Sequence, residues 1–149
     1  MMTNSEKENA LREKASQHYL VCFINECPLH DHCLRWQAGQ YADPKPLVCK
    51  AINPRSSRVG SNQCVMYRSD QRVLMKLGLT KLYREMPTYM ERSIRQHLID
   101  RWGRKQYFEM RRGDRPITPE QQRQVVNACR KNGWTGSIVY DGEQEDWEW

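Results

Sequence analysis

The sequence predicts an α+β protein: a small cysteine-rich module packed on a helical part with a short sheet, in a winged-helix-like outline. Three observations predict this class: grouped cysteines in the first half, helix-capping patterns in the second half, and short β-branched or aromatic runs among them. The chain has 149 residues, of which 38% are hydrophobic, so its apolar content fills one modest core. A metal clip would stabilise the first half, which has little core of its own.

Composition divides the chain into four segments. Residues 1–17 form a polar arm, residues 18–69 the cysteine-rich module, residues 70–141 a basic helical part, and residues 142–149 an acidic tail. The polar start is unlike a secretory signal, and no window approaches the roughly 18 apolar residues that a membrane span needs. We therefore expect a cytoplasmic protein with no membrane contact, in which the thiols stay reduced.

Local patterns in the first half predict a strand, an irregular stretch and a helix. The β-branched and aromatic residues at 18–24 are typical of a short buried strand. Residues 39–62 are rich in proline, glycine and small polar residues, so they should be largely irregular. Asp70 can then serve as the N-cap of a helix that bends or breaks at Gly78.

The second half contains clearer helix signals. A capping box that opens at Thr88, followed by apolar residues every fourth position, predicts a helix that ends at Gly103. Residues 106–110 read as a strand before a basic turn. Thr118 and the proline after it predict the start of another helix. Residues 137–140 predict a last strand, and the acidic tail beyond them is expected to be mobile.

Grouped cysteines are the strongest chemical signal in the chain. The candidate zinc ligands are Cys27, Cys33, Cys49 and Cys64. Zinc takes four thiolate or imidazole ligands in tetrahedral geometry, and the short interval between the first two lowers the entropy cost of assembling such a site. Should one of the four not bind, the natural substitutes are Cys22, His30 and His32.

Two alternatives to zinc stay open. The cysteines can be small buried hydrophobic residues without metal, or they can hold an iron–sulfur cluster, which usually has tighter spacing. Catalysis is less favoured. Asp31 between His30 and His32 offers acid–base groups, but adjacent loop residues do not converge on a cysteine nucleophile without further support. The pattern therefore leans against an enzyme.

The net charge of +6 is unevenly distributed. Residues 71–131 carry 15 Lys and Arg against 6 Asp and Glu, whereas residues 132–149 carry none against 5. The planar guanidinium of arginine donates several hydrogen bonds to one phosphate, and aromatic rings stack on unpaired bases. The candidate nucleic-acid-binding residues are Arg101, Arg104, Lys105, Tyr107, Arg111, Arg112 and Arg115. The alternative is a solvated amphipathic helix with its arginines outward.

These patterns predict a zinc-containing nucleic-acid-binding protein with a regulatory role. The alternative is a protein–protein adaptor that has a structural zinc site, binds no nucleic acid, and contacts an acidic protein surface or uses its Trp-bearing tail. Phosphate binding weakens steeply with salt, whereas a mainly apolar contact does not, so salt dependence separates the two. We also expect the tail from Glu143 to Trp149 to screen the basic segment modestly.

Several runs of the chain also resemble a known family. These runs are Tyr19–Cys22, Cys27–Pro28, Cys33–Arg35, Asn53–Arg55, Cys64, Gly103–Tyr107, Arg112–Asp114 and Ile117–Gln121. Across residues 18–141 the chain resembles a small uncharacterised family of Bacteroidota proteins, a domain of unknown function. The resemblance implies a recurring architecture and a bacterial cytoplasmic setting, and it carries no activity.

Overall fold

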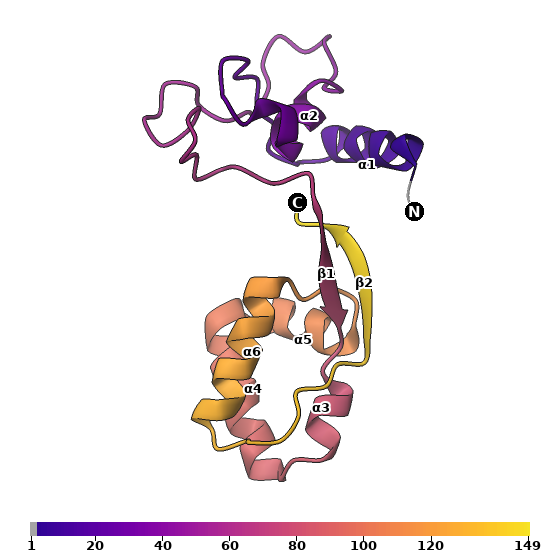
Figure 1. The fold of residues 1–149 in the computed structure, drawn as a ribbon, viewed down its shortest axis with the longest axis vertical. Coiled ribbons are helices and arrows are strands. Elements are labelled where there is room, and N and C mark those ends of the chain that lie inside the picture. The colour runs from indigo at the N-terminus through magenta and orange to yellow at the C-terminus, as the bar shows by residue number, and fades with distance from the viewer. Residues whose placement is uncertain (1–2) are drawn as a thin grey trace. The chain divides into compact units, whose positions relative to one another are not determined.

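The computed structural model describes residues 3–149 and has an α+β architecture (Figure 1). Within these residues there are six α-helices, one short 3-10 helix and one two-stranded antiparallel sheet. The α+β class predicted from the sequence is confirmed, whereas the winged-helix-like outline stays a prediction. The chain divides into two compact units: the described residues up to Gln71 with Trp147–Trp149, and Arg72–Asp146. The expected polar arm begins at residues 1–2, which lie outside the described part.

The first unit contains the helices α1 (Asn4–Ser16), η1 (His30–His32) and α2 (Leu34–Gly39). A capping box between Thr3 and Glu6 starts α1, so the polar lead of the chain is helical from its first described turn. The small core of this unit consists of Leu11, Val21, Leu34, Ala38 and Trp147. It is modest, as expected for a segment rich in polar residues.

The strand predicted at residues 18–24 is wrong. That segment forms only an isolated parallel bridge between Val21 and Ala51. A strand needs a continuous partner, and the chain that lies beside it belongs to the irregular stretch, which contains no helix or strand from residue 40 to 71. Backbone groups are therefore paired singly, as when the N–H of Cys22 donates to the carbonyl oxygen of Arg35. The expected irregularity of residues 39–62 is confirmed.

The second unit has four helices around one core and a strand pair. Its elements are β1 (Arg72–Leu77), α3 (Thr80–Arg84), α4 (Thr88–Trp102), α5 (Arg104–Arg112), α6 (Pro119–Lys131) and β2 (Gly142–Trp147). Helix α4 packs against α5 and α6, and β1 contacts both α5 and α6. Fully buried side chains fill the centre, among them Leu79, Ile94, Leu98, Met110 and Val125. No helix within residues 3–149 combines the length and apolar character that crossing a bilayer requires.

The sequence places two helices of this unit correctly. The predicted helix that ends at Gly103 is confirmed as α4, although Pro87 is its N-cap and Thr88 is its first residue, with no side-chain cap. Helix α6 has the predicted start: the Thr118 side chain accepts a hydrogen bond from the backbone N–H of Gln121 in a capping box, with proline at the first position.

Other predicted elements of this half are wrong. The helix expected after Asp70 is wrong before Gly78, where strand β1 ends at Leu77, but the break predicted at Gly78 (φ +75°) is confirmed and helix α3 begins at Thr80. The strand expected at 106–110 is helix α5, which buries Tyr107 and Met110 three positions apart on one face. The last strand begins later than expected, and the acidic tail that should be mobile forms β2 beside β1 (Figure 1).

Candidate functional site

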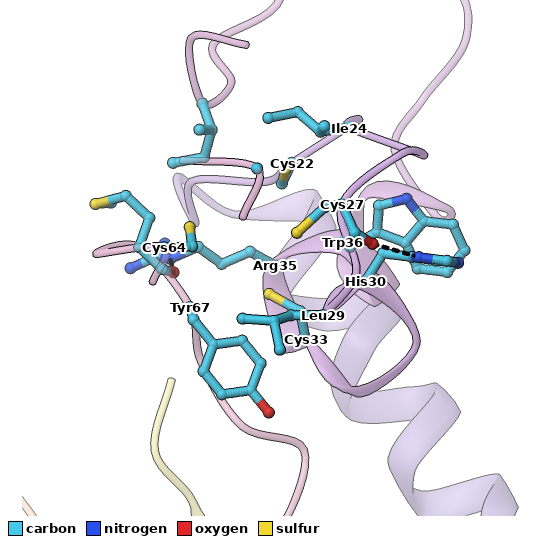
Figure 2. A pocket seen from close by; sticks show the side chains of 13 residues that line it. Cys22, Ile24, Cys27, Leu29, His30, Cys33, Arg35, Trp36, Cys64 and Tyr67 are labelled. Carbon is cyan, nitrogen blue, oxygen red and sulfur yellow. Dashed lines mark hydrogen bonds between the residues drawn. The ribbon is translucent and has the colours of Figure 1, made fainter. Parts of the chain in front are cut away.

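Four cysteines line one small pocket of the first unit (Figure 2). Cys22 follows the bridge at Val21, Cys33 immediately precedes α2, Cys27 lies between them, and Cys64 comes from the irregular stretch. Figure 2 shows their sulfur atoms facing a common space. The cavity measures about 20 Å³, which is room for about one water molecule or one ion.

Three of the four expected zinc ligands meet in this pocket, and Cys22 stands with them in place of Cys49. Cys49 is exposed and lines a separate hollow with His18 and Lys50. The interval from Cys22 to Cys27 is similar in length to that from Cys27 to Cys33. This similar spacing is the sequence feature that could have indicated Cys22 as a member of the group. As the side chains stand, no three His, Cys, Asp or Glu within residues 3–149 form a group that could hold a metal ion.

Neither candidate histidine offers a nitrogen to the pocket. The Nδ1 atom of His30 lies 2.7 Å from the carbonyl oxygen of Cys27, and its Nε2 atom lies 3.0 Å from Oδ1 of Asp31. Its ring packs edge-on against Trp36. His32 is largely exposed, with Nδ1 3.6 Å from Oδ1 of Asp70. The donors that face the cavity are therefore thiols.

Burial sets the ionisation of Cys22. Loss of solvent raises the pKa of its thiol, a hydrogen bond from the Ile24 backbone lowers it in part, and the nearby Cys33, Cys27 and Cys64 raise it again. The thiol form is thus favoured at neutral pH. Thiolates at this place need a cation to stabilise them.

A buried arginine lines the same pocket. Arg35 is 8% exposed, and its guanidinium donates hydrogen bonds to the carbonyl oxygens of Met66 and Leu20, each at 2.9 Å. It also lies over the Tyr19 ring, 5.0 Å from the centroid. Within residues 3–149 no carboxylate forms an ion pair with it. The guanidinium is hydrogen-bonded to the backbone, but no negative charge among the described residues neutralises it.

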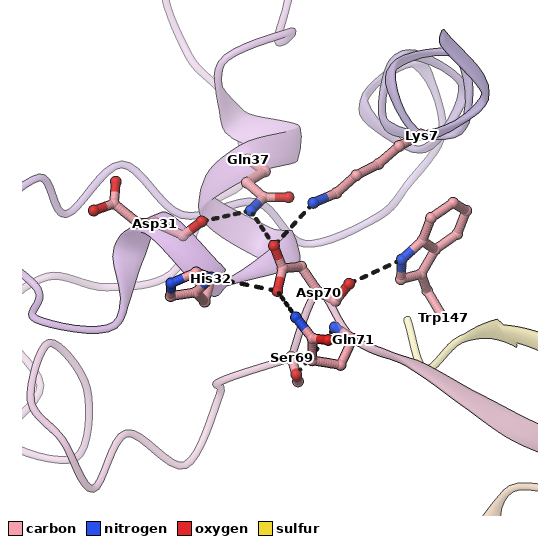
Figure 3. A network of polar contacts seen from close by, with 8 residues as sticks. All are labelled: Lys7, Asp31, His32, Gln37, Ser69, Asp70, Gln71 and Trp147. Atoms are coloured by element: carbon pink, nitrogen blue, oxygen red, sulfur yellow. Dashed lines mark hydrogen bonds and ion pairs between the residues drawn. The ribbon is translucent and has the colours of Figure 1, made fainter. Parts of the chain in front are cut away.

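Asp70 is the centre of a polar network that ties the first unit together (Figure 3). Its carboxylate accepts hydrogen bonds from Lys7 of α1 at 2.9 Å and from Gln37 of α2 at 3.0 Å. Its carbonyl oxygen accepts one from the indole N–H of Trp147 at 3.0 Å. Burial alone would raise the pKa of Asp70, but the bonds from Lys7 and Gln37 outweigh it and lower the pKa. Because the carboxylate is fully engaged, its role is structural.

The predicted nucleic-acid-binding residues fall into two groups, and Tyr107 belongs to neither because it is fully buried. Its phenol oxygen lies 2.9 Å from that of Tyr83, so its ring is not available to stack on a base. Three of the arginines are already paired with carboxylates. These pairs are Arg111 with Glu91 (3.2 Å), Arg112 with Asp114 (2.9 Å) and Arg115 with Glu109 (2.7 Å).

Arg101, Arg104 and Lys105 form the second group, which is exposed and has no carboxylate partner in the described chain. Arg104 lies over the ring of Phe108. Arg101 opens onto a hollow of about 270 Å³ on the surface formed by α4 and α6. This α4–α6 hollow is lined by His97, Arg101, Gln124, Asn127, Arg130 and Lys131.

The basic residues of α6 were missed in the sequence. Arg130 and Lys131 are cations in the last turn of a helix, a common position that by itself indicates only a favourable helix dipole. Their meeting with Arg101 depends on α6 packing beside α4, which no local pattern reveals. The acidic residues of the chain end lie elsewhere: Glu143 pairs with Lys76 at 2.6 Å and Glu145 with Arg72 at 3.8 Å, both on β1.

The chain belongs to a family of unknown function, DUF6078, whose model matches residues 2–149. The match extends over both units and includes the four cysteines of the pocket and the α4–α6 hollow. No curated protein and no solved structure matches the chain. The family therefore defines no activity, and function is inferred from the residues themselves.

Proposed function

We propose that the chain binds nucleic acid through its second unit, with the α4–α6 hollow as a phosphate-binding surface. The observation that carries this function is the composition of the hollow: Arg101, Arg130, Lys131 and His97 line it without any carboxylate. A concave surface lined by one sign of charge concentrates the potential and attracts the opposite charge. Two amides, from Gln124 and Asn127, add hydrogen-bond donors for phosphate oxygens.

The charges around the hollow favour a polymer of phosphates over a single small anion. Arg104 and Lys105 follow Arg101 closely at the start of α5 and are exposed, so further cations without carboxylate partners in the described part of the chain lie close in sequence to the hollow. Glu109 and Asp114 within the expected patch form ion pairs with Arg115 and Arg112, and Asp100, next to Arg101, accepts a hydrogen bond from Gln96. Because Tyr107 is buried, we expect contacts mainly to the backbone of the nucleic acid and weak sequence preference.

A pair of double variants tests this function. Arg101→Gln with Lys131→Gln removes two cations of the hollow, whereas Arg112→Gln with Arg115→Gln removes two cations that already have carboxylate partners. Binding of labelled single- and double-stranded oligonucleotides is measured by fluorescence anisotropy across a salt series. Each lost phosphate contact should reduce the slope of log K against log salt by roughly 0.7–0.9.

We expect the hollow variant to bind more weakly, with the slope reduced by about two contacts, and the matched control to change much less. Arg130 is left intact because its guanidinium holds the carbonyl oxygens of Trp134 and Gly136. If the wild-type protein binds no oligonucleotide at low salt, or if both variants lose affinity equally, the hollow is only a solvated face.

A second function, a protein–protein adaptor, is favoured by one observation. Leu47 and Val48 are adjacent apolar residues on the irregular stretch and are 102% and 87% exposed. The Trp-bearing tail is a weaker contact for a partner because Trp147 is buried in the first unit. A photo-crosslinking residue is placed in living cells at position 47 or at position 100, an exposed site next to Arg101 that leaves the hollow's cations intact. Recovery of protein only from position 47 supports an adaptor, and recovery of nucleic acid from position 100 supports the first proposal.

A further inference from the structure

We propose that Cys22, Cys27, Cys33 and Cys64 bind one zinc ion as four thiolates, in a structural site of the first unit. The site does not depend on nucleic-acid binding, which is placed in the second unit. It differs from the set expected from spacing alone because Cys22 replaces Cys49.

Tight turns present the cysteines to the cavity. The backbone N–H groups of Cys27, Cys33 and Cys64 each donate to a carbonyl oxygen three residues earlier: Ile24 at 3.4 Å, His30 at 3.1 Å and Ser61 at 3.1 Å. The N–H of Cys22 is held by the carbonyl oxygen of Arg35 at 3.0 Å. Each of the four backbones is therefore held by a hydrogen bond beside the cavity that the cysteines line.

The donor set selects the metal. His30 and His32 are engaged elsewhere, and no carboxylate lines the pocket, so sulfur is the donor that remains. Four thiolates in tetrahedral geometry are the ligands of a structural zinc site. A cavity of about 20 Å³ suits a single ion, whereas a cluster of several iron and sulfide atoms needs much more space.

Arg35 supplies an independent argument. A buried charge is normally paired or bound to an ion, yet this guanidinium lines the cysteine pocket without a carboxylate partner in residues 3–149. One zinc ion with four thiolates has a formal charge of −2. Such a centre provides the missing counter-charge within the same pocket, and Arg35 in turn stabilises the anionic site.

Binding is a coordination step with a defined proton balance. One Zn²⁺ ion and four thiols form a four-thiolate complex and release four protons to solvent. In the structure the four cysteines line the cavity but do not yet form a metal-holding group. Rotation of the side chains brings each sulfur to about 2.3 Å from the ion. Coordination by Cys64 and by the cysteines of residues 22–33 then cross-links the irregular stretch to that segment and restricts its motion.

The test uses the full chain purified without a histidine tag. Elemental analysis should find about one zinc per chain in the wild type and in Cys49→Ser, and a loss of zinc in Cys22→Ser. Cys49→Ser is the matched control because that cysteine is exposed and outside the pocket. Retention of zinc by Cys22→Ser, or its loss from Cys49→Ser, overturns the assignment.

A measurement on the wild type covers the case in which Cys22→Ser does not fold. Alkylation is mapped by mass spectrometry before and after a chelator. Cys22, Cys27, Cys33 and Cys64 should be protected together until the metal is removed, whereas Cys49 should react in both states. Replacement by Co²⁺ should produce the absorption of a tetrahedral four-thiolate site. Unchanged alkylation after chelation, or iron with strong visible absorption in the purified protein, contradicts the zinc site.

Discussion

Asp141 and Thr80 are joined by two hydrogen bonds to one carboxylate oxygen. The Oδ2 atom of Asp141 accepts from the backbone N–H of Thr80 at 3.1 Å and from its hydroxyl group at 2.7 Å. The Oδ1 atom accepts from the N–H of Lys81 at 2.8 Å. Leu79, the N-cap residue of α3, has no side-chain acceptor, so a residue from the end of the chain performs the capping.

Removal of this cap should destabilise the second unit. Asp141→Ala should reduce the free energy of unfolding by about 1–2 kcal/mol, as measured by urea denaturation. Glu143→Ala, which removes only an exposed ion pair with Lys76, is the control and should cost less than about 1 kcal/mol. Equal losses for the two variants would show that Asp141 does not act as a cap.

The same carboxylate makes stability depend on pH. Burial alone would raise the pKa of Asp141, but hydrogen bonds from Lys81 and Thr80 outweigh it, so the folded-state pKa lies below the usual value. Such a group stabilises the fold above about pH 4 and loses this contribution as pH falls through its folded pKa. Asp141→Asn should therefore lose less stability between neutral and acid pH than the wild type does. Parallel curves would contradict this linkage.

Tyr83 and Tyr107 form a buried phenol pair with their oxygens 2.9 Å apart. Tyr107→Phe leaves the hydroxyl group of Tyr83 buried without its partner, which should cost about 1–3 kcal/mol. Replacing both tyrosines by phenylalanine removes both polar groups and should be closer to neutral. A double-mutant cycle from urea denaturation measures this difference. Simple additivity of the two single changes would argue against a coupled pair.

Asp70 should hold α1 in place through Lys7. Asp70→Asn removes the charge that pairs with the ammonium group, so hydrogen exchange of residues 4–16 should accelerate. The lowered pKa of Asp70 keeps this anchor charged at neutral pH and weakens it only in acid. Glu8→Gln, an exposed change on the same helix, is the control and should leave exchange unchanged. Equal exchange in all three proteins would show that α1 is held by other contacts.

Trp147 should contribute strongly to the first unit although it lies near the end of an acidic segment. It is 6% exposed and packs in the core with Leu11 and Leu34. Trp147→Ala should lower the free energy of unfolding by about 3–5 kcal/mol, with a loss of near-ultraviolet circular dichroism. Glu148→Ala is the exposed neighbour used for comparison. If Trp147→Ala is as stable as the wild type, the end of the chain does not contribute to the core and behaves as the mobile tail predicted from its composition.

The sequence by itself determined the features that depend on near neighbours. Helix α6 starts where Thr118, a proline and Gln121 form a capping box, because all the groups involved lie within four residues. Helix α4 ends at Gly103, whose φ of +85° suits glycine. The irregular stretch follows from its prolines and glycines, which interrupt regular hydrogen bonding. Thiol chemistry also identified Cys27, Cys33 and Cys64 as residues that belong together.

Only the tertiary structure decided the features that need a distant partner. Residues 72–77 carry a helix-compatible pattern but become β1 because β2, from the far end of the chain, pairs with them. That Cys22 and not Cys49 lines the cysteine pocket depends on how the irregular stretch folds back. Which arginines form ion pairs depends on which carboxylates lie beside them. Hydrogen bonds, burial and charge act over a few ångströms in space, and local sequence does not reveal which remote residues come within that distance.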